Sequence, residues 1–126
     1  MNYVIPMSKN MTDKKLAHHF SKADIFCVYN EQYKNLAVFK NPALEVKGCS
    51  GKGLLIDALH KYHCDVVIVR KIGEKTLARL LNAGFSVEQG NTRHSVEELL
   101  IAASTRQHSL TEPSQGVKKK ISCSGH

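Results

Sequence analysis

The chain has 126 residues, of which 42% are hydrophobic, and carries a formal net charge of +7 with a pI near 9.3. That length and composition favour one globular domain with its own core. No apolar run reaches the roughly 18 residues of a membrane span, so we expect no membrane-spanning helix. The excess of positive charge indicates an anionic partner. Because no secretory signal precedes the four cysteines, we expect a cytoplasmic protein with reduced thiols.

The first half of the chain predicts three β-strands, at residues 2–8, 24–30 and 33–40, because each is rich in β-forming residues. The turn between the second and third strands is short, which makes these strands antiparallel neighbours. The longer connection at residues 9–22 is polar and basic, and we expect it to be irregular. The side chains expected to face inward from the third strand are Leu36, Val38 and Phe39.

The second half alternates helices and strands. We predict helices at 51–63, 74–82 and 95–104, with strands at 65–69 and 85–89. Gly84 occupies a C-cap position after the second helix, and Ser95 caps the third, with acidic residues in its first turn. The last residues are polar and include a run of three lysines. We therefore divide the chain into a domain at 1–104 and a flexible basic tail at 105–126.

This order of elements predicts an α/β fold with a five-stranded mixed sheet in the order 3-2-1-4-5 and helices on its faces. The two crossovers that lead to strands four and five are expected to be right-handed and to make parallel neighbours. The carboxyl ends of strands one, three, four and five then share one edge. Ligands of such sheets bind beyond that edge at the switch point, here between strands one and four. The segments gathered there are His18–His19, Gly48–Gly53, Arg70–Gly73 and Gly90–His94.

Several segments are similar to one known family. They are Tyr3–Met7, His19-Phe20 followed by Ala23, the loop Gly48–Gly53, the run Asp65–Gly73 and the run Leu80–Val87. Together they resemble the dinitrogenase iron–molybdenum cofactor biosynthesis family over roughly residues 2–104. The resemblance implies a ribonuclease H-like fold, which agrees with the predicted topology. It also implies binding without enzymatic turnover, since relatives carry the iron–molybdenum cofactor of nitrogenase, or its iron–sulfur precursor, between assembly proteins.

On this resemblance we predict a non-enzymatic carrier of an anionic iron–molybdenum or iron–sulfur cluster, as in nitrogen fixation. Its expected partners are metal-cluster assembly or acceptor proteins, and a homodimer is left open. The chain departs from the family pattern at three positions. Ser21 and Lys22 stand where the family commonly has Gly and Arg, and Glu74 stands where it commonly has Pro. Lys22 keeps the positive charge of Arg but lacks its planar fork of donors.

The candidate ligands to metal are His19 and Cys49. His19 takes the family's histidine position, and a neutral imidazole is a good ligand for such metals. Its neighbour His18 could instead bind, or both could be exposed loop residues. Cys49 lies between glycines at a helix N-terminus, an environment that favours the thiolate, although it could equally be an incidental loop residue. The remaining candidates, which offer backbone donors or positive charge to an anion, are Gly51, Lys52, Arg70, Lys71 and Gly73.

Other histidines and cysteines give weaker signals. His60 and His63 share one helix face beside Cys64 and could hold a divalent metal, but helix ends favour histidines through the dipole alone. Cys27 lies in a middle strand and is expected to pack in the core. Cys123 and His126 are too few for a closed metal site, so we favour a solvated tail.

Two alternatives compete with cluster binding. The positive charge and the nuclease-like topology favour a nucleic-acid-binding domain, but no carboxylates are clustered as nuclease catalysis requires. Aromatic residues make up only 6% of the chain, so stacking platforms for bases are scarce, which makes nucleic acid the less favoured partner. The loop at 48–53 resembles a phosphate-binding P-loop only loosely, because the spacing and the preceding strand are absent. No constellation typical of an enzyme stands out.

Overall fold

The computed structural model describes residues 1–7, 16–17, 19–45, 50–106 and 108–116. Its strands are β1 (Tyr3–Met7), β2 (Ile25–Tyr29), β3 (Asn35–Lys40), β4 (Val66–Val69), β5 (Ser86–Gln89) and β6 (Ser109–Leu110). Its α-helices are α1 (Ser50–Lys61), α2 (Glu74–Asn82) and α3 (Val96–Ser104), and three short 3-10 helices are η1 (Phe20–Lys22), η2 (Pro42–Glu45) and η3 (Pro113–Gln115). Every helix in these segments is too short or too polar to reach across a lipid bilayer.

The strands form one mixed sheet in the order β3-β2-β1-β4-β5-β6. The predicted order of the first five strands is confirmed: β1 runs antiparallel to β2 and parallel to β4, which runs parallel to β5. The predicted count of five strands is wrong, because β6 pairs antiparallel with β5. The ribonuclease H-like class stays a prediction of the resemblance, since strand order alone does not establish it.

The sixth strand lies within residues that the sequence analysis assigned to the tail. Leu110 is buried beside Val87, and the Ser109 hydroxyl donates a hydrogen bond to the buried carboxylate of Glu88. Two residues in a polar stretch are too few to show the alternation by which strands are found in a sequence. The ordered chain therefore adds one short strand beyond the predicted domain boundary at residue 104.

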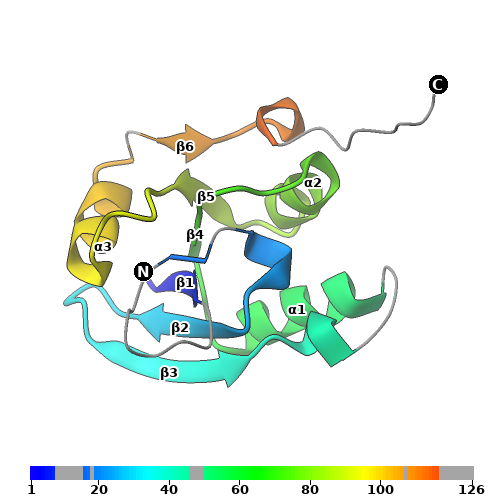
Figure 1. The fold of residues 1–126 in the computed structure, drawn as a ribbon, viewed down its shortest axis with the longest axis horizontal. Coiled ribbons are helices and arrows are strands. Elements are labelled where there is room, and N and C mark those ends of the chain that lie inside the picture. Colours follow the sequence, from blue (N-terminus) through cyan, green and yellow to red (C-terminus); the bar gives the residue numbers. More distant parts are fainter. Residues whose placement is uncertain (8–15, 18, 46–49, 107, 117–126) are drawn as a thin grey trace.

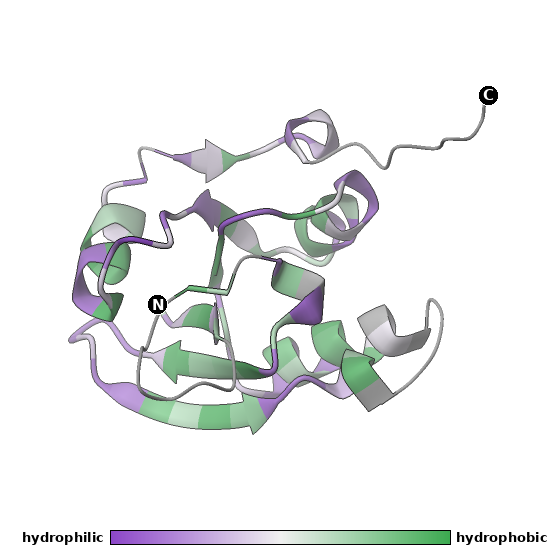
Figure 2. Ribbon diagram, in the orientation of Figure 1, coloured by the Kyte–Doolittle hydropathy of each residue, from purple (hydrophilic) through white to green (hydrophobic). Residues whose placement is uncertain are grey.

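Two hydrophobic layers cover the two faces of the sheet. Helices α1 and α2 lie on one face and α3 on the other, as Figure 1 shows. The four residues of β4 are all buried, since this strand is covered on both sides. Figure 2 shows apolar residues along β2 and β3, while the loop that follows β5 is largely polar. The apolar side chains thus hold the strands in place, and the polar side chains that could bind a ligand lie at the ends of the sheet.

One face of β3 differs from the prediction. Leu36 and Val38 were expected to face inward, but they are 53% and 51% exposed. Ala37 and Phe39 pack against the core under α1 instead, which confirms the expectation for Phe39. Because successive side chains of a strand point to opposite faces, only one of these two pairs can face that core.

The predicted end of α2 and the predicted cap of α3 are confirmed, whereas α1 ends at Lys61, two residues before the predicted end at His63. The Ser95 hydroxyl accepts a hydrogen bond from the backbone N–H of Glu98, and the Glu98 carboxylate accepts one from the Ser95 N–H, which makes a complete capping box. These bonds lower the pKa of Glu98 from its ordinary value. Gly84 follows α2 with φ +94°, a conformation that favours glycine.

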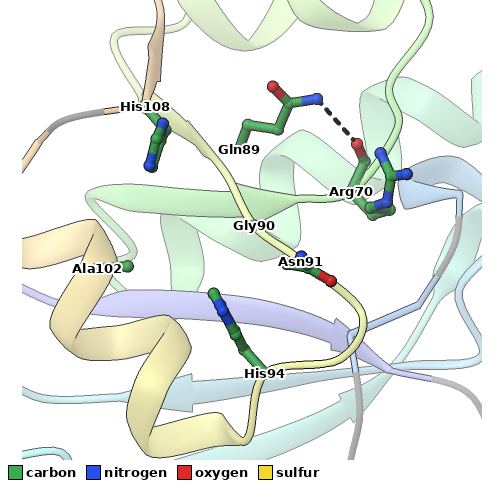
Figure 3. A pocket seen from close by; sticks show the side chains of 7 residues that line it. All are labelled: Arg70, Gln89, Gly90, Asn91, His94, Ala102 and His108. Carbon is green, nitrogen blue, oxygen red and sulfur yellow. Dashed lines mark hydrogen bonds between the residues drawn. The ribbon is translucent and has the colours of Figure 1, made fainter.

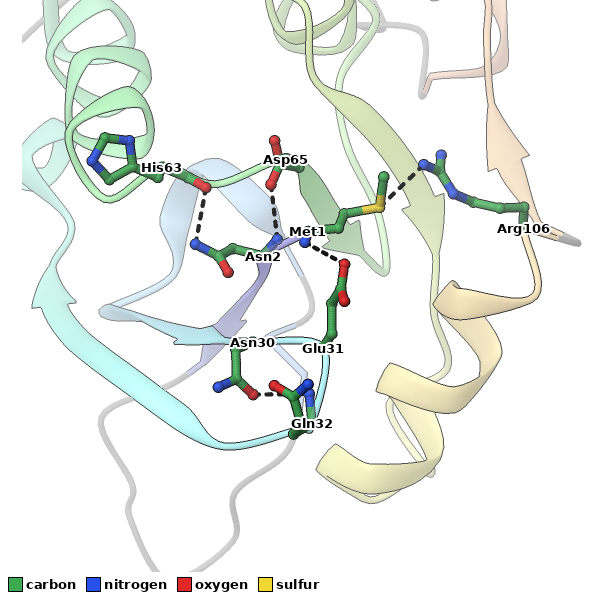
Figure 4. Close-up of polar contacts among 8 residues, drawn as sticks. All are labelled: Met1, Asn2, Asn30, Glu31, Gln32, His63, Asp65 and Arg106. Carbon is green, nitrogen blue, oxygen red and sulfur yellow. Dashed lines mark hydrogen bonds and ion pairs between the residues drawn. The ribbon is translucent and has the colours of Figure 1, made fainter.

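The amino edge of the sheet is closed by contacts within the chain, shown in Figure 4. The Asn2 backbone N–H donates to the Asp65 carboxylate at 2.8 Å, and its side-chain amide donates to the His63 carbonyl at 3.1 Å. The terminal ammonium of Met1 pairs with Glu31 at 2.6 Å. These polar groups satisfy one another, so this edge serves mainly to fix the start of β1.

Candidate functional site at the carboxyl edge of the sheet

The other end of the sheet, which we call the carboxyl edge, gathers most of the predicted site residues. Strands β1, β3, β4 and β5 all end there, because parallel strands present their carboxyl ends on one side. The segments that make up the carboxyl edge are His19–Ala23, η2, the start of α1, Arg70–Gly73, Gln89–His94 and His108.

The edge brings His19 beside Lys71, although these residues are far apart in sequence. They form a parallel β-bridge, in which the Phe20 N–H donates to the Lys71 carbonyl at 3.1 Å. The contact lies beyond β1 and β4, at the predicted switch point. His19 is exposed and Lys71 is half-buried, and the bridge brings these two residues side by side at the carboxyl edge.

The core holds the turn that carries His19. The Phe20 side chain is only 1% exposed, and its ring meets that of Phe26 edge-on, with 5.4 Å between centroids. Phe26 stacks on Phe39, which stacks on Tyr62, directly after α1, at 4.6 Å between centroids. A further anchor follows the turn, where the buried side-chain amide of Asn41 donates to the Ala23 carbonyl at 2.8 Å. The position of His19 is therefore set by a chain of aromatic contacts through the core.

Gly51 lies at the start of α1, where the helix meets η2. A Cβ at this position would lie 3.0 Å from the Cα of Ala43 and 3.1 Å from its carbonyl oxygen. By contrast, a Cβ at Gly53 would meet nothing within 4 Å. The observed reason for glycine at position 51 is therefore close backbone packing, beside any role in anion binding.

This difference predicts opposite effects of one substitution. Gly51→Ala is expected to lower the free energy of unfolding by about 1 kcal/mol, because the backbone of η2 must move. Gly53→Ala is expected to raise it by up to about 1 kcal/mol, because alanine favours the helix. Urea unfolding followed by circular dichroism measures both. Equal stability of the two variants would contradict tight packing of η2 against α1.

A cavity of about 390 Å³ opens at the carboxyl edge between β5, α3 and the residue before β6. Figure 3 shows His94 and His108 directed into it from two sides, with Arg70 at the end of β4. The remaining lining residues are Gln89, Gly90, Asn91 and Ala102. A smaller cavity of about 150 Å³ shares Arg70 and Gln89 and continues past Lys71 and Ile72 toward Leu110 and Gln115.

The order of the strands predicts His94 at this edge, but nothing in the sequence gives it a role or marks His108 as part of the site. His108 was counted with the tail, yet its carbonyl accepts from the Gln89 N–H at 2.9 Å. This contact could not be predicted, because the two residues of β6, Ser109 and Leu110, are too few to be recognised as a strand in the sequence. A histidine directly before a strand that closes the sheet would have been a signal, had that strand been recognised.

The predicted residues divide by place. His19, Arg70, Lys71 and Gly73 lie on the carboxyl edge, with Gly51 at the start of α1. His18, Cys49, Cys123 and His126, together with the side chain of Lys52, fall outside the described residues. The structure therefore brings His19 to Lys71, and the two metal-ligand candidates His19 and Cys49 stay untested as a pair.

The opposite edge does not form the weaker metal site considered in the sequence. Cys64 is buried, and burial, reinforced by the Asp65 charge, raises the pKa of its thiol to about 12, which disfavours the metal-binding thiolate. His60 packs on the Phe85 ring at 4.7 Å. Cys27 is buried, as predicted, with its thiol 3.5 Å from the Met7 sulfur. Across the described segments, no three His, Cys, Asp or Glu side chains are grouped to hold a metal ion.

Solved structures with the same fold include three proteins of low sequence identity. The apo orange protein of Desulfovibrio gigas has a TM-score of 0.71 and 18% identity, with 85% of this chain and 89% of that chain covered. A candidate NifB protein of Thermotoga has a TM-score of 0.69 and 20% identity, with 87% and 93% covered. A candidate dinitrogenase of Methanocaldococcus jannaschii has a TM-score of 0.59 and 12% identity, with 90% and 97% covered.

A family model described as dinitrogenase iron-molybdenum cofactor matches residues 1–106. The match therefore covers the sheet up to β5 and all three α-helices, including the turn at His19 and the segment after β4. A comparison with curated proteins found no match.

Proposed function

Since the chain belongs to the dinitrogenase iron–molybdenum cofactor family, we propose that it is a non-catalytic carrier of an anionic iron–molybdenum or iron–sulfur cluster. The cluster is its cargo and is held at the carboxyl edge. The observation that carries the proposal is the contact of His19 with Lys71 at the switch point between β1 and β4. The bridge supports the proposal because it pairs the backbone of a candidate metal ligand with that of a lysine, at an edge where sheets of this kind bind ligands.

Charge supports an anionic cargo at this edge. The side chains of Arg70 and Lys71 follow β4 directly, and Lys22 adds a third cation from the His19 turn. Exposed cations attract an anionic cluster and release it again when the ionic strength or a partner changes the balance. A carrier requires this reversibility, whereas an enzyme would need a positioned acid or nucleophile.

The remaining candidates have subsidiary roles in this proposal. Gly73 precedes α2, and the first turn of that helix leaves backbone N–H groups directed at the edge. Glu74 adds a carboxylate nearby, which limits how much negative charge the site accepts. His18, Cys49 and Lys52 stay predicted contributors. We also keep the partners as a proposal; they would be cluster assembly or acceptor proteins.

A nucleic-acid-binding role gains no support from the described residues or from the comparisons. The aromatic rings that could stack on bases are used in the core, as Phe20, Phe26 and Phe39 show. Cluster binding therefore remains the one function proposed.

Anaerobic reconstitution with iron, sulfide and molybdate tests the proposal. Wild-type protein is expected to take up stoichiometric metal, and His19→Ala is expected to lose most of it because a ligand is removed. His63→Ala, at the amino edge, is the matched control and should keep wild-type uptake. If the wild type takes up no metal or cluster absorbance, the carrier proposal is wrong. Full uptake by His19→Ala would instead show that other residues hold the metal.

A further inference from the structure

The cavity between β5 and α3 has a lining of which the cluster proposal uses only Arg70. The amide of the lining residue Gln89 already donates to the Arg70 carbonyl, and four further side chains carry hydrogen-bond donors or cations: Arg70, Asn91, His94 and His108. Across the described chain, no hydrogen bond engages the guanidinium of Arg70, the Nδ2 amide of Asn91 or either imidazole. The Asn91 side chain uses only its oxygen, which accepts from the Arg93 N–H at 2.9 Å. Donors without partners therefore meet in one hollow.

The contrast with the amino edge makes this arrangement informative. There, Asn2, Asp65 and Glu31 satisfy the polar groups around the start of β1. At the cavity, the polar backbone is satisfied, since the Gly90 N–H donates to the Val69 carbonyl at 2.7 Å and the Gln89 N–H donates to the His108 carbonyl. Only the side-chain donors are left over. The backbone hydrogen bonds here stabilise the fold, but the side-chain donors make no hydrogen bond that would explain their presence in the cavity.

The fold also keeps the hollow rigid. A Cβ at Gly90 would lie 2.7 Å from Leu99 and 3.0 Å from both Ile68 and Leu16, so the chain leaves β5 closely packed on the core. The Ser95 capping box fixes the start of α3 directly after His94. The pairing of β6 with β5 fixes His108. The donors are thus held by three separate elements, which favours a preorganised site.

The sign of the charge selects an anion. None of the described lining residues is acidic, and Arg70 is permanently positive. Imidazoles bind divalent metals, but a nearby guanidinium opposes a cation and no carboxylate completes a ligand set. Two acidic side chains belong to the elements around the cavity: Glu98, which interacts electrostatically with His94 but is held in its capping box, and Glu88, whose carboxylate accepts from Ser109.

We propose that this cavity binds a small oxyanion with two negative charges, either free or as part of a larger molecule, through His94, His108, Asn91 and Arg70. Phosphate, sulfate and molybdate share this chemistry. A volume of about 390 Å³ exceeds the need of one such group, so the site also accommodates ordered water or the remainder of a phosphorylated molecule. The proposal does not depend on cluster binding.

Titration calorimetry on the full chain without iron tests it, with phosphate, sulfate and molybdate as separate probes in a chloride buffer. Wild-type protein is expected to bind at least one of them. The affinity of the His94→Gln/His108→Gln double variant is expected to be lower by about tenfold or more.

His63→Asn is the control, since His63 lies at the amino edge with φ +57°, which asparagine tolerates. It should bind as the wild type does. A preference for molybdate over phosphate and sulfate would identify the free metal oxyanion, and a tighter fit for phosphorylated small molecules would identify the larger ligand. The proposal is overturned if no probe binds, if the double variant binds equally, or if zinc binds in its place and weakens as the pH falls.

Discussion

Phe20→Ala is expected to lower the free energy of unfolding by about 3–5 kcal/mol, the usual cost of removing a fully buried phenylalanine. The ring is 1% exposed and contacts Phe26, so its loss leaves a cavity where the His19 turn meets the core. A small domain is stable by only about 5–15 kcal/mol, so this is a large share of the total. Urea denaturation followed by far-ultraviolet circular dichroism measures the change.

The same variant is expected to take up less cluster even where it is still folded. His19 is then attached to a turn whose buried anchor is missing, although the Phe20 N–H can still reach the Lys71 carbonyl. Phe20→Leu fills most of the space and should lose less stability, about 1.5 kcal/mol or less. Leu44→Ala, at a half-exposed position of η2, should change the free energy of unfolding by less than about 0.5 kcal/mol. A loss below about 1 kcal/mol in Phe20→Ala would contradict the anchoring role.

Reversing the charges after β4 is expected to reduce cluster uptake by about tenfold or more, because two cations next to an anionic cargo become anions. The variant is Arg70→Glu/Lys71→Glu. The folded state should persist, since the hydrogen bonds of both residues within the described structure use their backbone carbonyls: that of Arg70 accepts from Gln89 at 3.3 Å, and that of Lys71 from Phe20 at 3.1 Å. Metal analysis after anaerobic reconstitution gives the result.

The matched control makes the same change in net charge at the other end of the molecule. Lys34 and Lys61 are both exposed and lie toward the amino edge, in the turn before β3 and at the end of α1. Lys34→Glu/Lys61→Glu should keep nearly full uptake at moderate salt, because charges beyond about 10 Å are screened. Equal losses in the two double variants would show that net charge alone attracts the cluster.

Much of the fold could be predicted from the sequence, because its main elements have strong local signals. The apolar run Val66–Val69 marked a strand buried on both faces, and Ser95 with Glu98 marked the start of α3. The errors have a common physical source. Leu36 and Val38 were assigned to the wrong face because an edge strand with apolar residues on both faces does not reveal its register.

The candidate site could be predicted only in part. Reading the order of the strands was enough to place His19 near Arg70 and Lys71, since topology alone brings those segments to one edge. The cavity was beyond reach because it depends on His108, and His108 is positioned by a strand of two residues. The packing role of Gly51 could not be predicted either, because a glycine-rich loop motif does not reveal the close contact of Gly51 with Ala43.

The most direct test of the central claim is where the cluster sits on the protein. In a nuclear magnetic resonance spectrum of ¹⁵N-labelled protein reconstituted anaerobically, paramagnetic iron broadens the amide signals closest to it. The account predicts broadening at His19–Ala23, Arg70–Gly73 and the start of α1, with sharp signals at the amino edge around Glu31 and Asp65. Broadening centred on the amino edge, or spread evenly over the molecule, would contradict binding at the carboxyl edge.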